Sequence, residues 1–310
     1  ECCIVHFALF IPILFFVLVQ PKTMQPTTLP TYDQLLRPLP PWNPKAWYYG
    51  LLRVSLKTMG KLSTGVRIGY RYGFDSGIML EYVYRNRPSG ITPLGTLIDW
   101  YYLNSQGWCG IRQRSKVLKA TLREVLMTYQ QQGIHCHLLD VACGGGRYDL
   151  EVLRDFPREA VTATLRDYKN ENVAKARQLA TQMGINAHIE QADAFSEGDL
   201  NLVQPRPNVV VVSGLHEILP DDGLIANHFR QLYRIMETSG TLVFTIQPHH
   251  PQLELIARTL PSHTGKPWVM RLRSWELTRQ WATAAGFRNL RVHMEPNGIF
   301  GVVVAEKPDL

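Results

Sequence analysis

The stretch "HLLDVACGGGRYDLEVL", residues 137–153, decides the fold. An apolar run leads into three glycines, and a second apolar segment follows, which is typical of a buried strand turning tightly into a helix. Such turns usually bind phosphate through their backbone amides. Here one acid, Asp140, precedes the glycines and another, Asp149, follows them. We therefore expect a nucleoside-like ligand that carries positive charge and no phosphate.

Strands and helices alternate from this motif onward. We expect strands at 137–142, 160–166, 187–192, 208–213 and 240–246, and helices at 146–156, 170–183, 198–203, 221–236 and 274–285. Asn170 is predicted to cap the start of helix 170–183, and Gly184 to end it. Alternation at this spacing indicates a parallel sheet covered by helices on both faces.

The chain closes differently. "FRNLRVHMEP" and "IFGVVVAEK" are joined around Asn297 and Gly298, which predicts an antiparallel hairpin with turn chemistry to match.

Ligands of open parallel sheets bind beyond the carboxyl ends of the strands. Asp167 ends the second expected strand, 21 residues after Gly146, where an acid can hold ribose hydroxyls. A dinucleotide-dependent oxidoreductase also uses such an acid, but its glycine fingerprint requires glycine where this chain has Asp149. That activity stays open as an alternative at this point.

Residues from about 117 to 308 resemble the class I S-adenosylmethionine-dependent methyltransferases. The resemblance depends on five segments in order, which are "LLDVACGGG", "LRDYKNENVAKA", "QADAF", "VVVVSGLHEIL" and "AAGFRNLRVHMEPNGIFGVVVAEK". The full length resembles an uncharacterised methyltransferase family with a long N-terminal extension, whose members sometimes carry lipase-like hydrolase domains. The resemblance implies a Rossmann-like, seven-stranded α/β sheet in three layers, α/β/α, with a helical N-terminal extension.

The resemblance also implies S-adenosylmethionine as cofactor and a role for individual residues. The implied cofactor residues are Asp140, Ala142, Gly144, Gly146, Asp167, Tyr168, Asp193, Ala194 and Ser213. Asp140 would orient the loop and the ligand's amino group, and Asp167 would accept from both ribose hydroxyls. Tyr168 would lie against adenine, and Asp193 would accept from its amino group unless it merely caps a turn. Ala142 replaces the first glycine of the motif, which is tolerated if its backbone is ordinary.

Methyl transfer needs a general base only for an acceptor whose proton has a high pKa. His216 and Glu217, after the fourth expected strand, are the candidate catalytic residues. Alternatively they line the cofactor pocket without titrating. No carboxylate or cysteine lies near His249 and His250 in sequence, so we expect no metal.

The N-terminal part is basic. Residues 1–130 hold 15 Lys or Arg and 6 Asp or Glu, a net charge of +9, against −2 for residues 131–310. We expect three regions: a hydrophobic segment at 1–23, a basic, aromatic-rich extension at 24–116 that forms a substrate lid together with 248–273, and the methyltransferase domain at 117–310. Residues 70–110 show no clear period.

Two segments suit a membrane. Residues 2–19 carry no formal charge and would span about 27 Å as a helix; they are either an anchor or translated sequence upstream of a start at Met24. Residues 46–62 form an amphipathic pattern with Tyr48, Leu51 and Leu52 on the apolar face. That helix either packs on its own domain with its basic face in solvent or lies in a membrane interface. With five cysteines and no CxxC pair, we expect a cytoplasmic protein, with attachment to the inner membrane face open.

The mixture of aromatic residues and arginine suits a small amphiphilic or lipid-like acceptor. The candidate substrate residues are Tyr101, Tyr102, Trp108, Arg112 and Arg114. A non-catalytic binding module at a membrane and an RNA methyltransferase are the alternatives, and nucleic acid is disfavoured because no RNA-binding module is recognisable.

Overall fold

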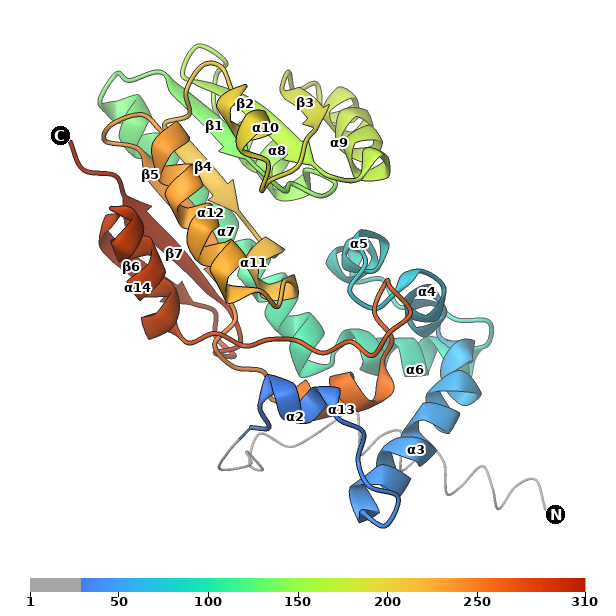
Figure 1. Ribbon diagram of the computed structural model, residues 1–310. Coiled ribbons are helices and arrows are strands. Elements are labelled where there is room, and N and C mark those ends of the chain that lie inside the picture. Colours follow the sequence, from blue (N-terminus) through green and yellow to red (C-terminus); the bar gives the residue numbers. More distant parts are fainter. Residues whose placement is uncertain (1–28, 310) are drawn as a thin grey trace. The chain divides into compact units, whose positions relative to one another are not determined.

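A seven-stranded sheet organises the C-terminal part of the chain, of which the computed structural model describes residues 29–309 (Figure 1). The strands are β1 (Cys136–Asp140), β2 (Val161–Asp167), β3 (His188–Gln191), β4 (Val209–Val212), β5 (Thr241–Ile246), β6 (Arg288–Met294) and β7 (Gly301–Glu306). Their order is β3-β2-β1-β4-β5-β7-β6, with β1 to β5 parallel and β7 antiparallel to both β5 and β6. The predicted parallel sheet with an antiparallel C-terminal hairpin is confirmed.

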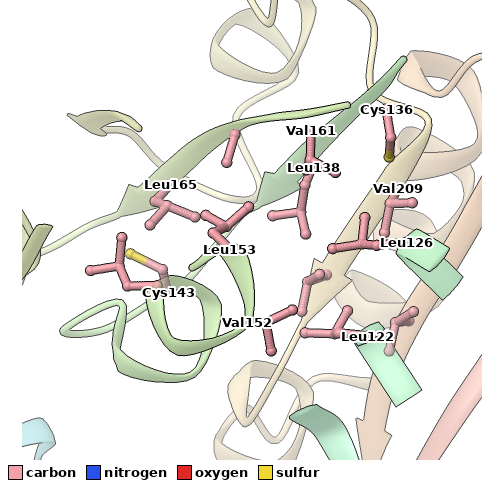
Figure 2. Packing of buried hydrophobic residues seen from close by; sticks show 14 of the residues in the cluster. Leu122, Leu126, Cys136, Leu138, Cys143, Val152, Leu153, Val161, Leu165 and Val209 are labelled. Carbon is pink, nitrogen blue, oxygen red and sulfur yellow. The ribbon is translucent and has the colours of Figure 1, made fainter. Parts of the chain in front are cut away.

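Helices cover both faces of the sheet, as expected. One face packs against α7 (Gln106–Gln131), α8 (Arg147–Leu153) and α9 (Asn170–Met183), and Figure 2 shows this core between α7, α8 and strands β1, β2 and β4. The other face packs against α10 (Glu197–Asn201), α12 (Asp222–Ile235) and α14 (Trp275–Ala285). Because strands such as β4 and β5 contribute to both cores, their sequences are apolar throughout.

One local prediction was wrong in detail. Lys169, not Asn170, is the N-cap of α9; no side chain caps this end, and two residues separate the helix from β2. The predicted hairpin joins β6 to β7 through residues 295–300, where the buried Glu295 carboxylate accepts from the Asn297 and Ile299 amides and so organises the loop around Asn297 and Gly298. Gly184 ends α9 in the left-handed conformation, as predicted.

The described chain divides into two compact units. One comprises the described part of residues 1–112 together with 250–270, and the other comprises 113–249 together with 271–310. The first unit is helical, with α2 (Tyr32–Leu36), α3 (Pro44–Lys57), a 3₁₀ turn η1 (Met59–Leu62), α4 (Thr64–Tyr72), α5 (Gly77–Arg85), α6 (Pro93–Leu103) and α13 (Leu253–Thr259). Residues 250–270 contact the N-terminal segment, for example where Arg258 donates to the carbonyls of Gln34 and Leu35.

Residues 70–110, whose sequence shows no clear period, are largely helical. Ser63, Ser76 and Thr92 cap α4, α5 and α6 by accepting from amides in the first turns. At the centre, the fully buried Asp99 carboxylate accepts from the Ser89 and Gly65 amides and from the hydroxyls of Ser63 and Tyr82. One carboxylate therefore joins the segments around α4, α5 and α6.

Among the helices between residues 29 and 309, none is long and apolar enough to cross a membrane. The hydrophobic segment 1–23, including the run 2–19, lies outside the described residues.

Candidate functional site

The carboxyl ends of β1, β2 and β4 lie at one edge of the sheet, since these neighbouring strands are parallel. This edge brings together Asp140, Asp167 and Ser213. Two hydrogen bonds join the glycine loop to the end of β2: the Gly144 amide donates to Asp167 Oδ2 at 2.9 Å, and the Cys143 amide donates to the Arg166 carbonyl at 2.8 Å.

The glycine loop is shaped by two residues with positive φ. Gly144 has φ +58° and Gly146 has φ +67°, a conformation that favours glycine. A Cβ on Gly144 would meet nothing within 4 Å, so the backbone there faces open space. A Cβ on Gly146 would lie 3.2 Å from the Ala176 side chain, so this glycine also lets α9 pack closely. Ala142 is not among the positive-φ residues, so its replacement of a glycine costs no backbone strain.

Three amides of this loop are already used within the protein. Ala142 donates to Asp140 Oδ1 at 2.9 Å, Gly144 donates to Asp167, and Gly146 donates to the Cys143 carbonyl at 3.0 Å. A pyrophosphate depends on such amides for binding. The loop is therefore poorly suited to a dinucleotide and leaves close backbone approach as its contribution to a ligand.

Asp140 and Asp149 form a fully buried pair beneath the loop. The Tyr148 hydroxyl donates to Asp140 Oδ2, while neither oxygen of Asp149 has a hydrogen bond of acceptable geometry. Burial raises the pKa of Asp140 to about 7, and burial together with the neighbouring Asp140 raises that of Asp149 well above its ordinary value. Burial at this depth opposes a negative charge on Asp149, so the expectation that both acids present charge to a ligand stays a prediction.

Asp167 is the acid that holds the glycine loop to the end of β2. Its Oδ1 accepts from the Lys169 amide at 2.8 Å and from the Asn172 side chain at 3.0 Å, and its Oδ2 accepts from Gly144. A carboxylate offers about four lone-pair sites. Three are occupied, so one site on Oδ2 remains for a ribose hydroxyl, and a second hydroxyl would have to displace Asn172. Sequence reasoning missed Asn172, although its place in the first turn of α9 was a usable signal.

The residues after β2 and β3 form the next part of the edge. Tyr168, which follows β2, is 70% exposed. After β3, Ala194 is buried, and Asp193 is exposed with its Oδ1 accepting from the Phe195 amide. Asp193 therefore does cap a turn, the alternative that its sequence left open, and its contact with adenine stays a prediction.

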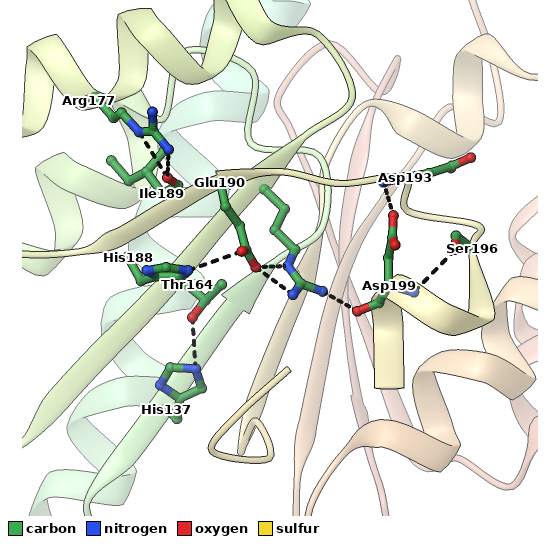
Figure 3. A network of polar contacts seen from close by, with 10 residues as sticks. His137, Thr164, Arg177, His188, Ile189, Glu190, Asp193, Ser196 and Asp199 are labelled. Carbon is green, nitrogen blue, oxygen red and sulfur yellow. Dashed lines mark hydrogen bonds and ion pairs between the residues drawn. The ribbon is translucent and has the colours of Figure 1, made fainter. Parts of the chain in front are cut away.

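A polar network fixes this turn (Figure 3). Arg166 pairs with Glu190 at 2.5 Å and donates to the Asp199 carbonyl, while Asp199 Oδ2 accepts from the Asp193 amide at 2.8 Å. A pocket of about 190 Å³ lies beside this network and includes Arg166, Glu190 and Asp199 in its lining. Arg166 in the pocket wall is already paired with Glu190, and none of the predicted site residues lines the pocket. The polar network therefore serves to hold Asp193 in place.

The two candidate catalytic residues lie in a short helix, α11 (Leu215–Ile218), after β4. His216 is buried, and its Nε2 hydrogen bonds with His228 Nδ1 at 2.9 Å. Burial, together with His228 and Arg273, holds the pKa of His216 well below its ordinary value. His216 is therefore neutral and internally paired, which favours a lining role over proton transfer.

Glu217 is buried, and within the part of the chain that the structure describes neither of its oxygens has a well-formed hydrogen bond, although the Thr245 hydroxyl lies near enough to lower its pKa. Arg114 Nη1 lies 3.8 Å away, close enough to attract the charge but beyond hydrogen-bond distance. Burial raises the pKa of Glu217 although Arg114 opposes the shift. A buried, unsatisfied carboxylate costs free energy, and such groups occur where a ligand completes the contacts.

Arg273 holds the segment that carries these residues. Its guanidinium donates to the carbonyls of His216 and Leu219 and to Asp222 Oδ1, at 2.7 to 2.8 Å. No sequence signal pointed to this contact, because Arg273 lies more than 50 residues from its partners.

The other predicted substrate residues belong to the helical unit. Tyr102 and Trp108 are buried there in an aromatic cluster, with Trp108 stacked on Trp268 at 6.1 Å. Arg112 donates to the Leu103 carbonyl at 2.7 Å, and Tyr101 is half-buried. Packing accounts for Tyr102 and Trp108, and substrate contact by any of these four residues stays a prediction.

Comparison with known proteins gives a family match over residues 17–307, to a family described as "Putative methyltransferase". The uncharacterized protein YnbC of Escherichia coli K12 is 39% identical over 272 residues, which are 87% of this chain and 46% of that protein. The chain thus spans less than half the length of this relative. A protein of Bordetella parapertussis described as a possible exported protein has a similar fold, with TM-score 0.62, 18% identity and 97% of each chain covered. The S-adenosylmethionine-dependent methyltransferase SibL is similar with TM-score 0.52, 15% identity and coverage of 99% and 98%.

Proposed function

This chain belongs to that methyltransferase family, and we propose that it transfers a methyl group from S-adenosylmethionine to a small amphiphilic or lipid-like acceptor. The family match and the fold support the predicted class I methyltransferase with S-adenosylmethionine as cofactor. The acceptor is the proposed part.

One observation carries the choice of ligand: the loop amides of Ala142, Gly144 and Gly146 bond within the protein, while the backbone at Gly144 faces open space. A phosphate-free ligand fits such a loop. Asp167 would hold a ribose hydroxyl through the remaining site on Oδ2, and Asp193 with the Ala194 amide would face adenine. When bound, the cofactor supplies a methyl group activated on a sulfonium, and a charged acid at the loop favours that cation.

The residues of the chain supply positioning first. In-line transfer depends on holding acceptor and donor at short range, and Arg273 fixes the segment after β4 on the side where an acceptor would lie. Glu217 is the group suited to accept a proton, since it is buried and unsatisfied and its raised pKa makes it a stronger base than an ordinary carboxylate. Arg114 beside it favours an anionic or polar head group.

Two measurements test the ligand. Calorimetry with S-adenosylmethionine, its demethylated product and NADH should give binding of the first two and none of NADH; preferential NADH binding would refute the methyltransferase assignment. Transfer of labelled methyl is then followed against lipid, small-molecule and RNA extracts. Label in the lipid or amphiphile fraction supports the proposed acceptor, label in RNA replaces it, and tight cofactor binding without any label indicates a binding module.

Glu217→Gln tests the base. Since general-base catalysis contributes about 10²–10⁴-fold, kcat should fall at least about 100-fold while the cofactor Kd changes less than twofold. Activity of the unchanged enzyme should rise with pH as Glu217 ionises, at a pH above the ordinary value of 4.5. His216→Gln is the comparison: retention of kcat would agree with a lining role for that histidine, and a 100-fold loss there alone would reassign the base.

A further inference from the structure

Helix α3 in the helical unit exposes apolar side chains along one line. Trp47, Leu51 and Val54 are 76%, 41% and 55% exposed and follow each other at i, i+4 and i+7, which places them on one side of the helix over about 10 Å. We call these three residues the outer stripe. The buried residues of α3 are Leu52 and Ser55, and the helix packs against α13 and η1. Of the predicted apolar face, Leu52 is therefore buried, whereas Tyr48 and Leu51 are exposed.

Aromatic residues flank the outer stripe at its beginning. Trp42 is 83% exposed, and Tyr48 is 36% exposed. The Trp47 indole N–H donates to the Pro41 carbonyl at 2.8 Å, which satisfies its polar atom and leaves the ring surface to contact an apolar phase. Tryptophan and tyrosine with one satisfied polar end are enriched where a membrane meets water.

The segment of sequence that contains the outer stripe carries charge of one sign. Residues 34–74 contain no Asp or Glu and seven basic residues, which are Arg37, Lys45, Arg53, Lys57, Lys61, Arg67 and Arg71. Lys45 pairs with Glu254, whereas Arg53, Lys57 and Lys61 are exposed. An apolar line beside exposed cations complements an anionic lipid surface.

We propose that the outer stripe docks α3 onto the surface of an anionic lipid bilayer, with Arg53, Lys57 and Lys61 at the head groups. A second copy of the chain is the weaker occupant, because a two-fold interface places each patch against itself and would oppose cation to cation. The surface area of three side chains is also small compared with the roughly 800 Å² that each partner buries in a stable protein–protein interface. The inference does not depend on methyl transfer, since docking is measured without cofactor.

The experiment is flotation of the full chain with vesicles of phosphatidylcholine alone or with about 30% phosphatidylserine. The unchanged protein should bind the anionic vesicles at least tenfold more tightly. Trp47→Ser/Leu51→Ser/Val54→Ser should lower the partition coefficient at least tenfold, whereas Leu202→Ser, which changes a side chain 74% exposed in the other unit, should leave it unchanged. Trp47→Phe/Val54→Ile should retain binding, because the stripe stays apolar.

Charge gives an independent readout. Each basic residue near an anionic surface contributes about fivefold to partition, so Lys57→Glu/Lys61→Glu should lower binding at least about 25-fold, and Lys175→Glu on α9 should not. Equal binding of the triple serine variant and the unchanged protein would assign attachment to another segment, such as residues 2–19, and would overturn the proposal. So would absence of binding to anionic vesicles, or a dimer in sedimentation that the triple variant dissociates.

Discussion

The buried pair of Asp140 and Asp149 predicts an unusual pH dependence of stability, and Asp149→Asn tests it. The ordinary pKa of an aspartate is 3.8, whereas burial raises the pKa of Asp140 in the fold to about 7. The folded state therefore holds a proton that the unfolded chain releases. Stability from this group is fully present below about pH 4 and is lost as the pH rises through about 7.

The magnitude follows from the size of the shift. The pKa of Asp140 rises by about three units, and each unit corresponds to roughly 1.4 kcal/mol. The free energy of unfolding should therefore fall by at most about 4 kcal/mol between pH 4 and pH 8 because of this group. Asparagine at 149 keeps the shape and can donate to the Asp140 carboxylate. It is also neutral in both states, so it removes the cost of keeping a proton on Asp149 that the unfolded chain releases at pH 8. We expect Asp149→Asn to stabilise this unit by at least about 1 kcal/mol at pH 8 and by nothing at pH 4.

Hydrogen exchange of the β1 and α8 amides measures the stability of the sheet unit, which contains both acids. The ratio of the exchange rates of the variant and the unchanged protein at each pH cancels the intrinsic pH dependence of exchange. Asp155→Asn is the control, since Asp155 is a partly exposed surface partner of Arg123 and should give no gain at pH 8. A variant that is equally or less stable than the unchanged protein at pH 8, or a gain independent of pH, would refute the raised pKa values of this buried pair.

Three further predictions follow from single contacts. Asp167→Asn should weaken S-adenosylmethionine binding by at least about 2 kcal/mol in calorimetry, because a charged acceptor is lost; unchanged affinity would remove Asp167 from the ribose site. Gly146→Ala should destabilise the sheet unit more than Gly133→Ala in urea unfolding, since both have positive φ but only Gly146 places a new Cβ 3.2 Å from Ala176; equal losses would contradict that contact. Asp99→Ala should cost at least about 3 kcal/mol in thermal unfolding of the helical unit, because four donors lose their acceptor; a loss below about 1 kcal/mol would show that these bonds are replaceable.

The sheet was predictable because its signals are local. Runs such as Val209–Val212 and Thr241–Ile246 are apolar on both sides, which predicts strands covered by helices on both faces. Gly144 and Gly146 have positive φ, the conformation that glycine adopts most readily in a tight turn. Acids at strand ends could likewise be assigned to one edge, because parallel order brings those ends together.

The contacts inside the site were less predictable because they join residues distant in sequence or depend on depth. Arg273 reaches the segment after β4 from 57 residues beyond His216, and His228 pairs with His216 from another helix. Asp149 looked like a charge at the loop, whereas its position on the inner side of α8 buries it. In the helical unit, Ser76 caps α5, a helix whose sequence has no clear hydrophobic period and was therefore not predicted.

The bond from the Gly144 amide to Asp167 gives the protein an internal spectroscopic reporter. A ligand that competes for Oδ2 of that carboxylate changes the electron density at the Gly144 amide proton. The Gly144 resonance in a nitrogen-15 correlation spectrum should therefore shift when such a ligand is titrated into the protein. Candidate nucleosides can thus be ranked at one assigned peak before the methyl acceptor is known.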